Sequence, residues 1–146
     1  MRMTVAVIAI AASVGIALAA GADTIKERRE LMKANGEASK PLVPMLKGAG
    51  PFDLATVQKA LKTYENAADK MPGLFPPDSK TGDTHALPAI WEGNNMADLD
   101  ARFKKLGEDA AAALASVKDE TSFRATMPDF FNNCGGCHEK YREKQQ

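Results

Sequence analysis

Residues 123–141 read FRATMPDFFNNCGGCHEKY, and this stretch carries both a helical pattern and the most specific motif of the chain. Its apolar and sulfur-bearing side chains recur at steps of three and four residues: Phe123, Met127, Phe130, Cys134, Cys137 and Tyr141. Such spacing places them on one face of an amphipathic helix. Pro128 interrupts the pattern, and we expect it near the start of this helix, where a proline is tolerated.

Residues 134–138 form a C-x-x-C-H motif, which is typical of covalent attachment of c-type haem. The thiols of Cys134 and Cys137 can add to the two vinyl groups of one haem, and His138 can reach its iron. These are the only cysteines of the chain, so a disulfide, a redox dithiol, a zinc site and chance are the alternatives. Zinc requires four ligands, whereas the other histidine, His85, is far away in the sequence. No strand-rich segment precedes Cys134, as a thioredoxin-like dithiol would require. We therefore predict one covalent haem c.

The amino end has the three regions of a secretory signal peptide. Arg2 is followed by an apolar run over residues 5–20 and by small residues up to Ala22. A retained membrane anchor is the alternative, but the run is shorter than the ~20 residues of a spanning helix. We therefore expect residues 1–22 to be cleaved, with no stable membrane anchor. Export together with a haem attachment motif predicts a periplasmic protein.

Charge and length narrow the class of protein further. The sequence has 19 Lys and Arg against 19 Asp and Glu, and no basic stripe of the kind that binds nucleic acid. Residues 23–146 suit one domain with one core.

Three other segments have helical spacing. Residues 54–68 follow Asp53, a suitable N-cap, and residues 96–117 have the clearest apolar seam. A first helix is expected to open near residue 23 and to run through Lys40, with Pro41 and Pro44 bending or splitting its far end.

A connection rich in Pro and Gly separates the second and third helices, from residue 70 to residue 95. Its length is unusual for a compact domain and indicates a crossover or a binding loop. Four helices of this size predict an all-α, antiparallel four-helix bundle with the cofactor between facing helices.

A signal peptide, four helices, and C-x-x-C-H in the last helix followed by EKYR at residues 139–142 resemble the class II c-type cytochromes, the cytochrome c' family. The likeness extends to IKER at residues 25–28, PMLKG at residues 44–48 and PAIW at residues 88–91. It covers essentially the whole of residues 23–146 and implies the bundle fold and the single covalent haem c.

The resemblance also assigns a role to Met32. RRELMK at residues 28–33 is most similar to the low-spin cytochrome c-556 branch, in which a methionine at this position binds the iron opposite the histidine. It implies a six-coordinate His138/Met32 iron, electron transfer with periplasmic redox proteins, and no enzymatic activity. The alternative is a five-coordinate cytochrome c' that binds or sequesters NO or CO. Met45 and Met71 are the competing methionines, and core packing is the ordinary role of a methionine on an apolar face.

Arg28 lies one turn before Met32 on the same helix face, and we expect it to contact a haem propionate. A surface arginine paired with Asp or Glu is the alternative. We expect His85 at the edge of the pocket, and Arg142 either near the haem edge or in solvent. The protein is expected to be a monomer or a homodimer.

Overall fold

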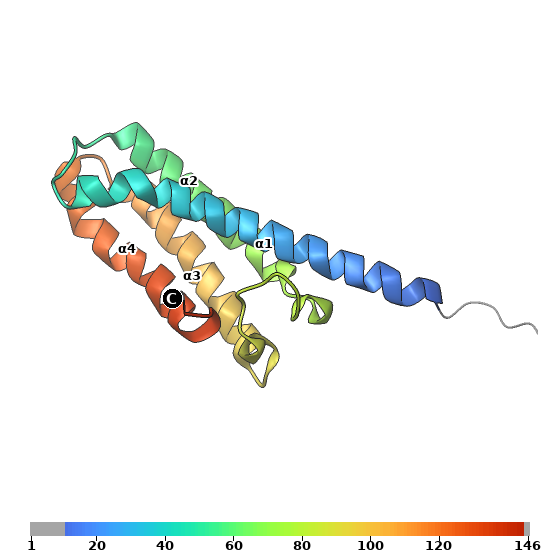
Figure 1. Ribbon diagram of the computed structural model, residues 1–146. Coiled ribbons are helices and arrows are strands. Elements are labelled where there is room, and N and C mark those ends of the chain that lie inside the picture. Colours follow the sequence, from blue (N-terminus) through green and yellow to red (C-terminus); the bar gives the residue numbers. More distant parts are fainter. Residues whose placement is uncertain (1–10, 145–146) are drawn as a thin grey trace, which may run out of the picture.

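The computed structural model describes residues 11–144, with side chains from residue 21 onward. Its four α-helices are α1 (Ala11–Leu46), α2 (Leu54–Lys70), α3 (Asn95–Ser116) and α4 (Glu120–Tyr141). Consecutive helices run in opposite directions and pack side by side (Figure 1). The predicted antiparallel four-helix bundle is therefore confirmed. Residues 1–10 of the predicted signal peptide lie outside the described residues, and its cleavage stays a prediction.

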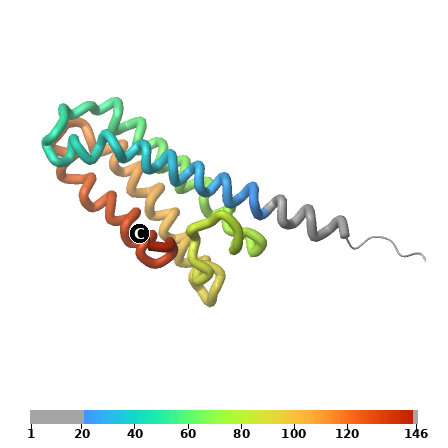
Figure 2. Tube along the Cα trace, viewed as in Figure 1, coloured from blue at the N-terminus to red at the C-terminus, as the bar shows by residue number. Residues whose placement is uncertain are grey.

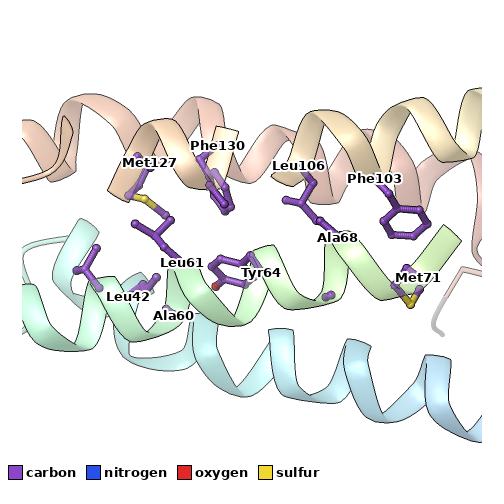
Figure 3. Close-up of a cluster of buried hydrophobic side chains, with 14 of the residues drawn as sticks. Leu42, Ala60, Leu61, Tyr64, Ala68, Met71, Phe103, Leu106, Met127 and Phe130 are labelled. Atoms are coloured by element: carbon purple, nitrogen blue, oxygen red, sulfur yellow. The ribbon is translucent and has the colours of Figure 1, made fainter. Parts of the chain in front are cut away.

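The core is built from the apolar stripes of the helices, as the periodicity predicts (Figure 3). Tyr64 of α2 and Phe130 of α4 meet with ring centroids 5.2 Å apart. The largest side chains with less than 2% exposure come from every part of the fold: Leu42, Val57, Leu61, Tyr64, Ile90, Leu99, Val117, Phe123 and Met127. Burial of this continuous stripe holds the bundle together.

Local capping sets where two of the helices begin. Asp53 caps α2, as expected, by accepting hydrogen bonds from the backbone N–H groups of Ala55 and Thr56. The prediction for α4 was wrong, because Pro128 lies well inside this helix and not near its start. Asp119 and Ser122 form a capping box that starts the helix at Glu120.

The first helix also differs from its prediction at the far end. It is not split, and it continues past Lys40 through Pro41 and Pro44 to Leu46. Each proline removes one backbone hydrogen bond. Leu42 lies between them and is fully buried in the core, so tertiary packing keeps the helical conformation where local preference alone would end it.

The connection between α2 and α3 contains three short 3₁₀ helices, η1 (Met71–Leu74), η2 (Pro77–Ser79) and η3 (Pro88–Trp91). Figure 2 traces it from α2 past α1 and back to α3. An isolated antiparallel bridge pairs its Ala86 with Arg142 just after α4. Within residues 11–144, none of the helices is both long enough and apolar enough to cross a membrane.

Candidate haem site

A cavity of 330 Å³ opens between α1, the connection, α3 and the end of α4. This volume lies within the ~300–1,000 Å³ typical of cofactor sites. The residues that line it are Arg28, Arg29, Met32, Lys33, Met71, Phe75, Thr84, His85, Ala86, Ile90, Leu99, Phe103, Cys137, His138, Tyr141 and Arg142. The lining combines apolar and basic side chains and includes no acid. It therefore fits a ligand with an apolar body and anionic groups, which describes a haem with its two propionates.

The helix α4 brings the attachment motif to this cavity. Cys137 and His138 line it, while Cys134 lies one turn earlier and is half-buried. The two cysteines are free, and burial raises the pKa of each thiol. A redox dithiol needs a lowered thiol pKa, so their surroundings disfavour that alternative.

The surroundings of His138 favour its neutral form. Burial lowers the pKa of its imidazole, and the positive charge of Arg142 lowers it further. A neutral imidazole is the form that binds a metal ion. The surroundings of His138 therefore suit an iron ligand.

The helix α1 and the connection contribute the methionines. Met32 is half-buried and lines the cavity, as does Met71, which is 3% exposed. Met45 is buried in the core and is not part of the lining. The structure thus leaves two of the three candidate methionines at the cavity.

Arg28 also lines the cavity, but its partners differ from the surface pairing that we considered as the alternative. It is 4% exposed, and its guanidinium donates hydrogen bonds to the Leu74 carbonyl, to the hydroxyl and carbonyl of Ser79, and to the Thr84 hydroxyl. Burial lowers its pKa, although an arginine stays charged in proteins. No carboxylate accepts a hydrogen bond from it within the described residues, so its charge is buried without an acidic partner.

Two further predictions can be placed. His85 lies at the cavity edge, as expected, with its Nδ1 3.3 Å from a carboxylate oxygen of Glu143. Arg142 lines the cavity, and its buried Nε has no hydrogen-bond partner in the structure. An unpaired buried donor at the cavity wall is a second reason why an anionic ligand fits.

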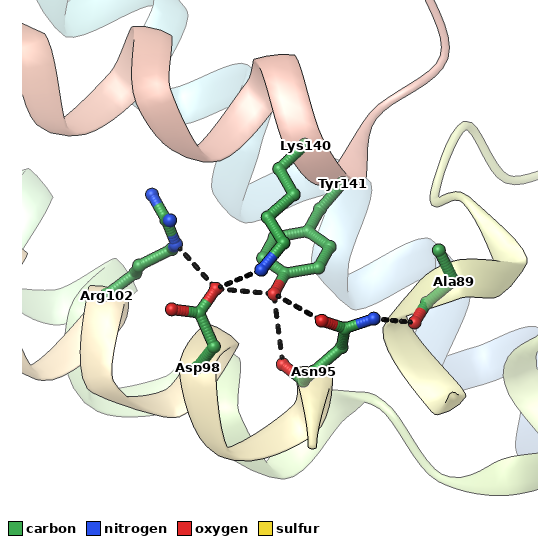
Figure 4. Close-up of polar contacts among 6 residues, drawn as sticks. All are labelled: Ala89, Asn95, Asp98, Arg102, Lys140 and Tyr141. Atoms are coloured by element: carbon green, nitrogen blue, oxygen red, sulfur yellow. Dashed lines mark hydrogen bonds and ion pairs between the residues drawn. The ribbon is translucent and has the colours of Figure 1, made fainter. Parts of the chain in front are cut away.

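The sequence analysis did not predict the residues whose hydrogen bonds hold the helices of the site in position. Asp98 of α3 accepts hydrogen bonds from Arg102, Lys140 and Tyr141, which ties the end of α4 to α3 (Figure 4). The spacing of Asp98 and Arg102 could have predicted their contact. The role of Ser79 had no sequence signal at all.

Comparisons with known proteins agree with this geometry. The sequence model of the family described as cytochrome C' matches residues 23–142, which is most of the chain. The chain belongs to the cytochrome c' family. Relatives named cytochrome c' and cytochrome c-556 are covalent haem c proteins, and the cofactor predicted from the motif is therefore established.

Similar proteins carry both names. Cytochrome c' from Rhodopseudomonas palustris is 44% identical over 147 residues, covering 99% of this chain and 99% of the relative. Cytochrome c-556 from Agrobacterium fabrum is 39% identical over 132 residues, covering 90% of this chain and 87% of the relative.

Solved structures give the same result. Cytochrome c' from Rhodopseudomonas palustris has a TM-score of 0.80 at 45% identity, covering 85% of this chain and 98% of that one. An NMR-validated structural model for oxidized cytochrome c556 from R. palustris has a TM-score of 0.75 at 29% identity, covering 85% of this chain and 98% of that one. The choice between the two branches therefore falls to individual residues of the site.

Proposed function

We propose that the protein is a periplasmic electron carrier with a low-spin, six-coordinate haem c. Cys134 and Cys137 hold the haem through thioether bonds, and His138 and Met32 are the two protein ligands of its iron. The observation that carries the proposal is that Met32 of α1 and His138 of α4 line the same cavity. Haem c bound there supplies a one-electron couple of its iron.

The two ligand side chains have different effects. The half-buried imidazole of His138, whose lowered pKa favours the neutral form, suits both oxidation states, whereas the soft thioether of Met32 favours the reduced iron. Together they leave no open coordination position. Such a protein exchanges electrons with redox partner proteins and transforms no substrate.

The basic side chains of the cavity act on the propionates. The four N–H bonds of the two Nη atoms of Arg28 already have acceptors, so Arg28 acts on a propionate mainly through its buried positive charge. Arg142 has a buried Nε still free to donate. Positive charge at the site stabilises the carboxylates and opposes the additional charge of the oxidised iron.

A second candidate function is a five-coordinate cytochrome c' that binds NO or CO. It is favoured by the relative that is 44% identical to this chain, which is named cytochrome c'. In that protein type Met32 would pack as an ordinary core side chain, and the position opposite His138 would be open to gases.

An optical spectrum of the haem-loaded protein separates the two functions. We expect a low-spin ferrous spectrum and, in the ferric protein, a weak far-red band from thioether-to-iron charge transfer. Met32→Leu should lose that band, become high-spin and bind CO rapidly while it keeps its covalent haem. The matched control Met71→Leu should retain the wild-type spectrum. A wild-type protein that is already high-spin and binds CO readily would establish the second function in place of the first.

A further inference from the structure

Arg28 fastens the α2–α3 connection to α1 at three separate points. Its Nη1 donates to the Leu74 carbonyl at 3.0 Å and to the Ser79 hydroxyl at 2.9 Å. Its Nη2 donates to the Ser79 carbonyl at 3.0 Å and to the Thr84 hydroxyl at 3.2 Å. We call these four residues the clasp.

The acceptors of the clasp are themselves held in position. Ser79 is fully buried, and its hydroxyl donates to the Pro76 carbonyl at 2.8 Å. The Thr84 hydroxyl accepts a hydrogen bond from the backbone N–H of Ala86 at 3.1 Å. Each of the two hydroxyls therefore joins Arg28 to a backbone turn of the connection.

Aromatic rings complete the surroundings of the guanidinium. It lies 4.6 Å from the centre of the Phe75 ring and 5.8 Å from that of Trp91. Trp91 also donates its indole N–H to the Phe75 carbonyl at 2.9 Å. Phe75 lines the cavity, so the cation–π contact links the clasp directly to the cavity wall.

The connection reaches both walls of the haem site. On one side the clasp joins it to α1, where Met32 follows Arg28 by one helical turn. On the other side the backbone N–H of Leu87 donates to the Tyr141 carbonyl at 2.9 Å, at the end of the helix that carries His138.

We propose that Arg28 is a positioning residue whose clasp keeps the connection closed over the distal side of the haem and keeps Met32 within reach of the iron. The effect on Met32 rests on the proposed function, whereas the closure of the cavity does not. Loss of the clasp lets the connection open locally, admits small ligands and weakens the iron–sulfur bond.

Carbon monoxide binding to the reduced protein measures the closure independently of Met32. In a Met32→Leu background the sixth position is open, so the CO association rate depends on how readily CO passes the connection. Adding Arg28→Gln should raise this rate about tenfold, because the loss of buried hydrogen bonds increases the fraction of molecules in which the connection is open. Ser79→Ala keeps the buried guanidinium and should raise the rate in the same direction, which tests the clasp even where Arg28→Gln yields no folded protein.

Lys26→Gln is the matched control in the same background. Lys26 also belongs to α1, but it does not line the cavity, and its ion pair with Glu30 is exposed. Exposed ion pairs contribute little, so the CO rate should stay within about twofold of the parent.

Amide hydrogen exchange supplies a readout that does not involve iron. With Met32 in place, Arg28→Gln should accelerate exchange over residues 74–84 relative to α2 and α3, and the ferric spectrum should gain a high-spin component. Unchanged exchange and an unchanged CO rate in both clasp variants would overturn the clasp. A high-spin wild-type protein would instead overturn the proposed function and leave the comparison in the Met32→Leu background intact.

Discussion

The hydroxyl of Tyr141 donates a hydrogen bond to Asp98, which ties the last residue of α4 to the first turn of α3. The same carboxylate oxygen accepts from Arg102 Nε at 2.9 Å and from Lys140 Nζ at 3.0 Å. These three hydrogen bonds, that of Tyr141 foremost, hold the pKa of Asp98 well below its usual range. Because His138 precedes Tyr141 by one turn, Asp98 fixes the helix end that presents the histidine.

Asp98→Asn is expected to destabilise the folded protein near neutral pH. The pKa of Asp98 is lower in the folded protein than its unfolded value of about 4, so its carboxylate stabilises the fold above that value. This stabilisation is lost as the pH falls through the folded-state pKa. Urea unfolding of the haem-loaded protein should show a difference between wild type and variant that is constant from about pH 7 to about pH 5 and shrinks as the pH falls below about 4. Asp100→Asn, an exposed neighbour, is the control, and a difference that is the same at every pH would contradict the prediction.

Attachment of the haem through two thioether bonds requires both thiols of the motif. Wild-type protein produced in exported form with a c-type maturation system should keep its haem through denaturation and acid-acetone extraction. Cys134→Ala or Cys137→Ala should leave at most one thioether bond, detected as a shifted pyridine haemochrome band. His138→Ala should keep the thioethers and lose the iron ligand. Haem that is extracted from the wild type would show that the attachment is not covalent.

Removal of a core side chain should cost far more than removal of a surface one. Leu61 is fully buried in the core, so Leu61→Ala should lower the free energy of unfolding by about 2–5 kcal/mol. The exposed neighbour Lys62→Ala should change it by less than about 0.5 kcal/mol. Urea unfolding of the two haem-loaded variants measures both values. A similar loss in both would place Leu61 outside the cooperative core.

Export should remove the amino-terminal segment. Mass analysis of the periplasmic fraction should give a mature start between Ala20 and Asp23, with the mass of one haem added to the polypeptide. This predicted cut lies within α1, where Gly21 packs so closely on the backbone of Asp78 that a side chain would collide with it. A product in the membrane fraction that keeps residues 1–20 would instead establish an anchored cytochrome.

The sequence predicts α2 and α3 to within two residues at each end, because an apolar seam and an N-cap such as Asp53 are local features. The start of α4 was predicted wrongly. The prediction relied on Pro128 as a helix-start signal and overlooked the capping box of Asp119 and Ser122. The end of α1 was also predicted wrongly, because the burial of Leu42 that holds this stretch helical depends on the other helices.

The candidate site also combines residues that a local motif predicts with contacts between distant positions that it does not predict. The C-x-x-C-H spacing is local, so the haem and its attachment could be predicted from the sequence. The partners of Arg28 could not, since Ser79 lies 51 positions away and no local pattern joins the two residues. Periodicity could place Arg28 on the inner face of α1 but could not distinguish a loop contact from a propionate contact.

The bridge between Ala86 and Arg142 has a consequence for the order of events in folding. Its flanking hydrogen bonds, Leu87 N–H to Tyr141 O and Glu143 N–H to His85 O, join positions more than 50 residues apart, and such long-range pairings form late. The connection is therefore expected to reach its final conformation only once residues 141–143 are available to pair with it. We expect the side of the bundle next to Cys137 to stay accessible until then, so that haem can be attached before the connection closes over it.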